Sequence, residues 1–149
     1  MKTNELRYKI KAASENDILL HLTECGDSFI PPLAERVNIN DYAKKIFERS
    51  VTFEGWAVDL LVGFIATYLD DNADRSAFIT NVSVLKSFAS LGIASKLLDM
   101  CIEYTRKNNF KILALEVHER NNPAIYLYKK FGFNAYETKG NMLLMKRQI

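Results

Sequence analysis

The feature that most constrains the fold is a change of hydrophobic period within residues 82–94. Val82, Ser83 and Val84 end a strand-like segment, whereas from Leu91 onward apolar residues recur at helical spacing. Small residues fill the turn between the two patterns. The first N–H groups of a helix have no partner within it and lie at the positive end of its dipole. The segment therefore predicts an anion-binding site at the start of a helix; the alternative is an ordinary turn with no binding role.

The patterns on either side of this turn predict the rest of the architecture. The run Phe110–Val117 is almost continuously apolar, as expected of a strand in the middle of a sheet that is covered on both faces. Asn40 or Asp41 is expected to cap a helix that ends near Ser50. The other helices are predicted after Ser14, from Leu91, and from Asn121-Asn122-Pro123 to Gly132. The other strands are predicted at Arg7–Ala12, Phe53–Val58, Leu61–Leu69, Ala77–Leu85, Phe133–Tyr136 and Met142–Lys146.

This order of elements predicts a mixed α/β sandwich, and the length of 149 residues with 48% hydrophobic residues predicts one domain, 1–149. The 20 basic and 18 acidic residues give a net charge of only +2, which argues against a nucleic-acid binder. Cys25 and Cys101 lie far apart, which argues against a disulfide framework or a metal site and favours a cytoplasmic location. No apolar run reaches the ~18 to 20 residues of a membrane span, so no membrane association is expected.

A second motif lies in residues 115–133. It places Asn121, Ala124, the pair Leu127-Tyr128 and the closing pair Gly132-Phe133 after a strand. This block resembles the second hallmark block of the GNAT acyltransferase superfamily. Gly92 and Ala94 resemble the pyrophosphate signature of that family, which is Arg or Gln, two residues, Gly, one residue, and then Gly or Ala.

The resemblance covers roughly Ile10 to Lys146 and implies a fold, a cofactor and a binding site. The implied fold is a mostly antiparallel sheet of about six to seven strands flanked by about four helices. The implied cofactor is acetyl-CoA. Ala89 and Ser90 depart from the family pattern, so backbone N–H groups are expected to bind most of the pyrophosphate, with Lys86 and Lys96 nearby. The predicted coenzyme contacts are Val82, Val84, Ala89, Ser90, Leu91, Gly92, Ile93, Ala94, Ser95, Asn121 and Tyr128.

The resemblance also implies catalytic residues. Glu116 is predicted as the general base that deprotonates the acceptor amine; the alternatives are a water held by Glu116 or Glu119 as the base, and an ordinary strand carboxylate with no catalytic role. Tyr128 is predicted as the acid that protonates the leaving thiolate, against the alternative of a core aromatic residue. A backbone N–H near Val84 is expected to meet the oxyanion. The cysteines and histidines are interpreted as structural, packing or surface residues, which favours direct transfer in a ternary complex.

The acceptor is least constrained by the sequence. The first hypothesis is a small-molecule amine, such as an amino sugar. A protein N-terminus is the second, and a non-catalytic acyl-CoA sensor or interaction module on the same fold is the third. A homodimer is a further hypothesis. The aromatic and proline side chains considered for the acceptor pocket are Phe29, Pro31, Pro32, Tyr42, Phe47 and Trp56.

Overall fold

A computed structural model describes residues 5–149 of the chain; residues 1–4 of the predicted domain lie outside the described part. Within it, seven strands form one sheet. The elements in chain order are β1 (Leu6–Ile10), α1 (Glu15–Cys25), η2 (Gly26–Ser28), η3 (Leu33–Glu35), α2 (Ile39–Arg49), β2 (Val51–Ala57), β3 (Leu60–Tyr68), β4 (Ser76–Val84), η4 (Lys86–Phe88), α3 (Ile93–Lys107), β5 (Ile112–His118), α4 (Asn122–Lys130), β6 (Asn134–Lys139) and β7 (Met142–Gln148).

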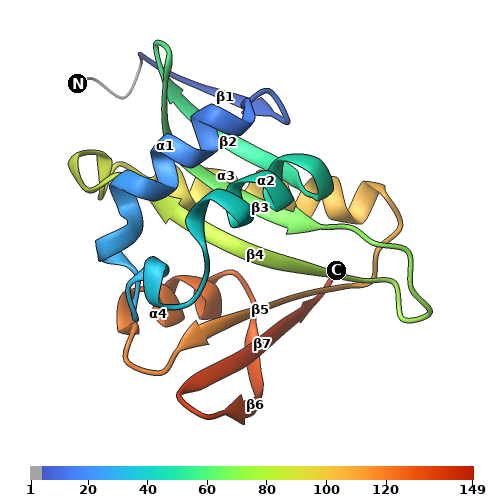
Figure 1. The fold of residues 1–149 in the computed structure, drawn as a ribbon. Coiled ribbons are helices and arrows are strands. Elements are labelled where there is room, and N and C mark those ends of the chain that lie inside the picture. The colour runs from blue at the N-terminus through green and yellow to red at the C-terminus, as the bar shows by residue number, and fades with distance from the viewer. Residues whose placement is uncertain (1–4) are drawn as a thin grey trace.

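The strands lie in the order β1-β2-β3-β4-β5-β7-β6, and all neighbours are antiparallel except β4 and β5. The pair α1 and α2 covers one face of the sheet, and α3 lies behind it (Figure 1). This arrangement confirms the predicted fold class, a mixed α/β structure with a mostly antiparallel sheet and four α-helices.

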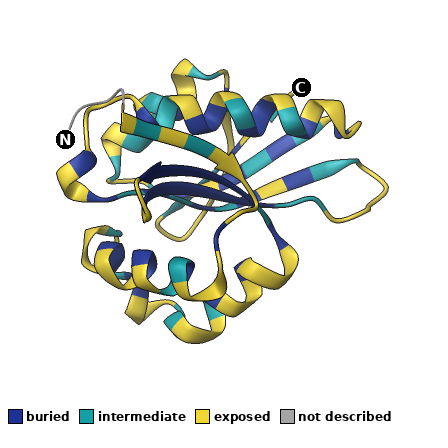
Figure 2. Ribbon diagram, turned by 90° about the horizontal axis from the view of Figure 1, so that it is seen from above, coloured by how far each residue is buried: buried dark blue, intermediate teal, exposed yellow. Residues whose placement is uncertain are grey.

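Alternating side chains on the central strands supply a hydrophobic core to each face. Phe53 and Ile65 join the core beneath α3, whereas Trp56 and Phe64 join the core beneath α1 and α2. Figure 2 shows the central strands buried between helices whose outward faces are exposed. Both faces of β2 and β3 are therefore covered, and these two strands form the most buried part of the sheet.

A buried carboxylate fixes the start of α1. Glu54 on β2 accepts hydrogen bonds from the backbone N–H groups of Ala12 and Ala13, each at 3.0 Å. The Thr52 hydroxyl donates to it at 2.5 Å and the Trp56 indole N–H at 3.0 Å. A buried charge is tolerated when its hydrogen-bonding capacity is filled in this way. The contact positions α1, which contributes side chains to the region described below.

Two helix starts differ from the sequence prediction. Asn38, rather than Asn40 or Asp41, caps α2 by accepting from the N–H of Asp41 at 3.0 Å. The helix predicted from Leu91 begins at Ile93, because Gly92 has a positive φ of 78° and stands outside the helix as its N-cap. Both differences are shifts of two or three residues at an element boundary, where a hydrophobic period carries little information.

The predicted central strand also differs. It begins at Ile112 rather than Phe110, and it is not covered on both faces, because Glu116 is exposed. In the sheet β5 lies between β4 and β7, one place from the centre. The apolar run therefore marks a strand with one well-buried face and a second face that stays open near its C-terminal end.

The two parallel strands separate along their length. Ser76–Ile79 pair with Ile112–Leu115, and pairing stops there. On the other side of β4, Ala66 pairs with Asn81 and Thr67 with Ile79, so Thr80 is an extra residue in β4. A bulge of this kind bends a strand away from its neighbour. Figure 1 shows the two arrows diverging toward their tips, and this region is called the β4–β5 opening below.

Candidate active site

A cavity of about 210 Å³ lies at the β4–β5 opening. One wall is formed by Thr80, Asn81 and Val82 of β4, and the other by residues 116–118 of β5 with Asn121 and Tyr128 of the following segment. The connection between α1 and α2 and the start of α2 close it with Phe29, Ile30, Leu33, Arg36, Val37 and Tyr42. Of the predicted site residues, the cavity brings together Val82, Glu116, Asn121 and Tyr128.

The remaining predicted coenzyme residues follow β4 as one continuous segment. Val84 ends that strand, and residues 89–95 form the turn and the first helical residues of α3. Ser90 and Gly92 both have positive φ, 63° and 78°. No atom lies within 4 Å of the position of a Cβ on Gly92, so this glycine is required by its backbone conformation rather than by crowding. These residues do not line the cavity but lead away from it.

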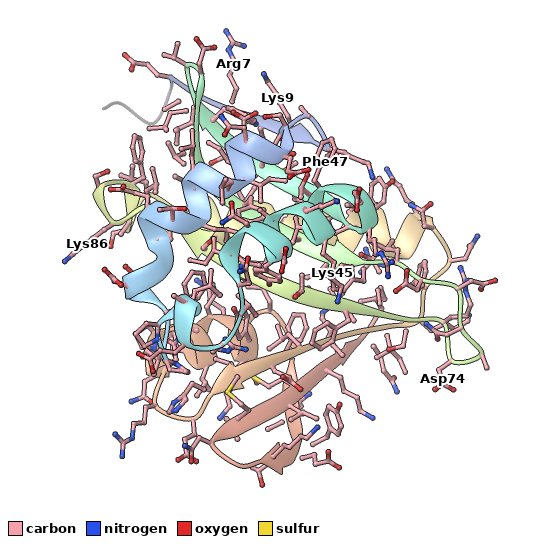
Figure 3. All side chains as sticks on the ribbon, viewed as in Figure 1. Arg7, Lys9, Lys45, Phe47, Asp74 and Lys86 are labelled. Atoms are coloured by element: carbon pink, nitrogen blue, oxygen red, sulfur yellow. The ribbon has the colours of Figure 1, made fainter. Side chains whose placement is uncertain are left out.

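The start of α3 differs from the starts of the other α-helices. Ser14, Asn38 and Asn121 cap α1, α2 and α4 through their side chains, whereas α3 has no side-chain cap. Its first N–H groups are thus left for another partner, and an anion satisfies both the hydrogen bonds and the helix dipole. Lys86 lies on the preceding loop and extends to solvent (Figure 3). The turn therefore fits a pyrophosphate group.

Polar contacts from the α1–α2 layer hold the β4 wall in place. The Tyr42 hydroxyl donates to the backbone carbonyl of the bulged residue Thr80 at 2.7 Å and lies 2.9 Å from its Oγ1. Burial raises the pKa of Tyr42, and its contacts with Thr80 oppose that rise. The hydroxyl stays protonated at neutral pH and keeps its role as a donor to the bulge.

His21 of α1 makes a second set of contacts with β4. Its Nδ1 lies 2.9 Å from the Leu61 carbonyl and its Nε2 2.9 Å from Ser83 Oγ, which lies 2.9 Å from Asn81 Oδ1. Burial lowers the pKa of His21, so the ring is neutral. A carbonyl only accepts, so Nδ1 carries the proton, and the single hydroxyl proton of Ser83 is donated to Asn81 Oδ1. The sequence hypothesis of a surface or packing histidine missed this network, which joins residues 62 positions apart.

Cys25 lies one turn after His21, with Sγ 3.5 Å from Nε2, a contact that the sequence analysis did not foresee. Both side chains are buried. Burial, together with the charge of Glu24, raises the pKa of Cys25 to about 11. Burial also raises the pKa of Cys101 to about 11. Both cysteines are thiols at neutral pH, and neither is a ready nucleophile.

The β5 wall carries the predicted acid and base. Glu116 is exposed and pairs across the sheet with Leu144. Tyr128 is 6% exposed, and its ring packs edge-on against Phe133 at 6.0 Å while the residue also lines the cavity. Burial raises the pKa of Tyr128 well above its ordinary value, so the phenol keeps its proton. Tyr128 is thus both a core residue and a wall of the cavity.

Asn121 lies at the same wall but its side chain is engaged. Asn121 Oδ1 accepts from the Ala124 N–H at 3.3 Å and caps α4. His118 Nδ1 accepts from the Arg120 N–H at 3.1 Å. Both contacts stabilise the turn from β5 into α4. In the structure Asn121 is therefore the N-cap of α4.

Of the six side chains considered for the acceptor pocket, Phe29 and Tyr42 line the cavity. Trp56 belongs to the core beneath α1 and α2, and Phe47 extends outward from α2 (Figure 3). Arg36 was missed, because nothing in the local pattern marks one arginine of a loop. Asn81 carried a usable signal, since asparagine is a residue type that strands usually lack.

Two negative findings hold for residues 5–149. None of their helices combines the length and apolar character that crossing a bilayer requires. No cluster of three or more histidine, cysteine or acidic side chains is placed there to bind a metal ion.

Residues 20–133, more than half of the chain, match the sequence model of the Acetyltransferase (GNAT) family. The probable N-acetyltransferase san of Drosophila melanogaster is 32% identical over 83 residues, 54% of this chain and 45% of that protein. N-alpha-acetyltransferase 50 of Danio rerio is 32% identical over 85 residues, 56% of this chain and 51% of the relative. The chain thus spans about half the length of these curated relatives.

Solved structures share the fold over nearly the whole chain. PH1933 from Pyrococcus horikoshii OT3 is 25% identical, with a TM-score of 0.76 over 96% of this chain and 99% of that chain. The PaiA N-acetyltransferase from Thermoplasma acidophilum, in complex with coenzyme A, is 16% identical, with a TM-score of 0.75 over 96% and 99%. At 16% identity the likeness shows the fold alone.

Proposed function

Because the chain belongs to the acetyltransferase (GNAT) family, we propose that it transfers an acetyl group from acetyl-CoA to a primary amine. The observation that carries this proposal is the β4–β5 opening. It places an exposed carboxylate, Glu116, and a buried phenol, Tyr128, on one wall of a single cavity. The uncapped start of α3 follows the opposite wall.

Acetyl-CoA, when bound, supplies an acetyl group already activated as a thioester. The N–H groups of residues 90–95 would hold its pyrophosphate, because they lie at the uncapped start of α3, whereas the Ala89 N–H already donates to the Lys86 carbonyl at 3.2 Å. Val82 and Val84 would offer main-chain groups from the strand that has separated from β5. Asn121 contributes indirectly, since its side chain caps α4. Backbone, rather than side chains, would supply most of this binding.

Glu116 would act as the general base. An alkylamine with a pKa near ~10.4 is mostly protonated at neutral pH, so the transfer needs an acceptor for its proton. The Glu116 carboxylate is exposed within the cavity wall, where it can take that proton directly or through a water. Glu116→Gln should lower turnover, whereas Glu137→Gln, which removes an exposed strand carboxylate of β6 outside the cavity lining, should not.

Tyr128 would act as the general acid that protonates the leaving thiolate of the coenzyme. Its raised pKa keeps the hydroxyl protonated at neutral pH, and its burial excludes water from around that proton. Direct transfer from coenzyme to amine is favoured over a covalent enzyme intermediate. The two cysteines support this, because their pKa values of about 11 leave no thiolate to attack.

The first candidate for the acceptor is a small-molecule amine. The cavity of about 210 Å³ is small, and Phe29, Ile30 and Tyr42 give it an apolar and aromatic side suited to a compact metabolite. A protein N-terminus is the second candidate, and the relative named N-alpha-acetyltransferase 50 favours it. A cytoplasmic location and a homodimer stay predictions.

Thermal shift with a panel of CoA esters, followed by thiol release with a panel of amines, tests the function. Stabilisation by acetyl-CoA together with thiol release on adding an amine is the expected result. Stabilisation without release by any amine or peptide N-terminus would instead support the non-catalytic sensor. Absence of stabilisation by every CoA ester would contradict both functions.

A further inference from the structure

The charges of the cavity lie at two different places in the fold. Among the described residues that line it, Arg36 and Glu116 are the side chains with a full charge at neutral pH. His118, which also lines the cavity, accepts a hydrogen bond at Nδ1 from the backbone N–H of Arg120. The cavity therefore combines one cation from the α1–α2 connection with one anion from β5.

A backbone hydrogen bond fixes Arg36 beside the cavity, while its guanidinium forms no ion pair with the described residues. It directly follows η3, and its N–H donates to the Leu33 carbonyl at 3.0 Å. The side chain is exposed, and no carboxylate of residues 5–149 lies within ion-pair distance of it. A guanidinium next to a cavity and without a protein partner is available to a ligand.

Tyr42 lines the same cavity as Arg36 and connects that side of the cavity to the β4 wall. Burial raises the pKa of Tyr42, and the nearby positive charge of Arg36 is among the influences that oppose the rise. The same Tyr42 hydroxyl is bonded to Thr80 of the β4 wall. Arg36, Tyr42 and Thr80 therefore all face the same cavity at the β4–β5 opening.

An acceptor with positive charges only is poorly matched to this arrangement. Its ammonium group is attracted by Glu116, but any second cation near Arg36 meets a like charge. A carboxylate or phosphate instead offers the planar guanidinium two oxygens at once. We propose that the acceptor carries, besides its amine, an anionic group, a carboxylate or a phosphate, and that Arg36 binds this group. The inference rests on the proposed function.

Matched pairs of acceptors test the proposal. One arm compares an ω-amino acid with its amide, and the other an amino sugar with its phosphate ester, so that the amine stays similar while the anion changes. The anionic member of at least one pair should have a KM about tenfold lower, which corresponds to one charge-assisted hydrogen bond. The arm with the larger difference identifies the anion as carboxylate or phosphate.

The variant Arg36→Gln should remove this preference. Its KM for the anionic acceptor should rise about tenfold, while the KM for the neutral partner and for acetyl-CoA stays unchanged. Arg7→Gln is the matched control, because Arg7 is an exposed arginine on β1 that extends to solvent at the far edge of the sheet (Figure 3). Equal effects of the two variants would show a bulk charge effect and overturn the proposal.

Equilibrium binding of the same pairs to the CoA-loaded protein keeps this test separate from catalysis. Tighter binding of the anionic member, lost in Arg36→Gln, supports recognition by Arg36 even if no turnover occurs, in which case the proposed activity alone fails. Turnover with equal or better use of the neutral members overturns the role of Arg36 and leaves the activity standing. A peptide N-terminus preferred over every anionic small molecule also overturns it.

Discussion

The two walls of the β4–β5 opening are built differently. On the β4 side, Tyr42 and His21 hold the strand through Thr80 and Ser83, and the turn that follows leaves the start of α3 uncapped. On the β5 side, the strand leads into a helix that the chain caps itself through Asn121. The side chains that line the cavity there include the carboxylate of Glu116 and the phenol of Tyr128.

This difference separates two tasks. On the β4 side, backbone groups are proposed to bind the coenzyme, and side chains hold that backbone in place. On the β5 side the backbone is satisfied internally, and side chains are the proposed reactive groups. Changes to the β4 side should therefore alter coenzyme affinity, whereas changes to the β5 side should alter turnover. Four measurements test this separation, beginning with the largest expected effect.

Tyr128→Phe should lower kcat about a hundredfold, because a general acid contributes roughly that much, while the Kd for acetyl-CoA stays unchanged. Tyr126→Phe is the control, since Tyr126 lies on the same helix with 73% of its surface exposed. Steady-state kinetics and calorimetry give the two quantities. A loss of coenzyme affinity without a loss of kcat would show that the phenol binds rather than reacts.

Gly92→Ala should weaken acetyl-CoA binding about tenfold, since an alanine resists the positive φ and shifts the amides of the turn. Gly140→Ala is its matched control: Gly140 has a φ of +60°, no atom within 4 Å of its Cβ position, and a place in the β6–β7 turn. Both variants should lose about 1 kcal/mol of stability. Equal loss of coenzyme affinity in both would contradict a role for this turn.

Asn121→Ala should lower the free energy of unfolding by about 1 kcal/mol, the usual cost of a lost N-cap. Ser14→Ala, which removes the cap of α1, is the comparison at a helix start outside the cavity. Chemical denaturation measures both. If Asn121→Ala also weakens acetyl-CoA binding as much as Gly92→Ala does, the amide binds the coenzyme and the two walls are less distinct than proposed.

The smallest effect is a pH dependence of stability. Burial lowers the pKa of His21 below the ordinary value of 6.5, so the unfolded chain takes up the proton more readily than the folded one. The contribution of neutral His21 to the free energy of unfolding is thus fully present above pH 6.5 and is lost as the pH falls below that value. Denaturation between about pH 8 and 5 should show a flatter profile for His21→Gln than for the wild type. A similar flattening in His118→Gln would argue against this assignment.

Much of the fold follows from local patterns in the sequence. The alternation around Phe53 and Phe64 and the helical period after Gly92 suffice for the element order, because each pattern reports which side of an element is buried. The cavity depends on different information. The bulge at Thr80 and the contact of His21 with Ser83 join segments that are distant in the sequence, and no local period encodes them.

The candidate site divides in the same way. Gly92, Tyr128 and Glu116 were predicted because they lie in two compact motifs with fixed internal spacing. Arg36 and Tyr42 reach the cavity only through the packing of α2 and the preceding loop on the sheet. Side chains that select an acceptor are therefore harder to predict from the sequence than those that follow the two motifs.

The short parallel pairing of β4 and β5 has a mechanical consequence. Strands β1–β4 and strands β5–β7 are two antiparallel halves of the sheet, and residues 76–79 with 112–115 form the seam between them. A molecule in the opening touches both halves beyond the point where the seam ends. A bound substrate would therefore connect the two halves where β4 and β5 share no hydrogen bonds. The force needed to separate the halves should be greatest when the site is filled.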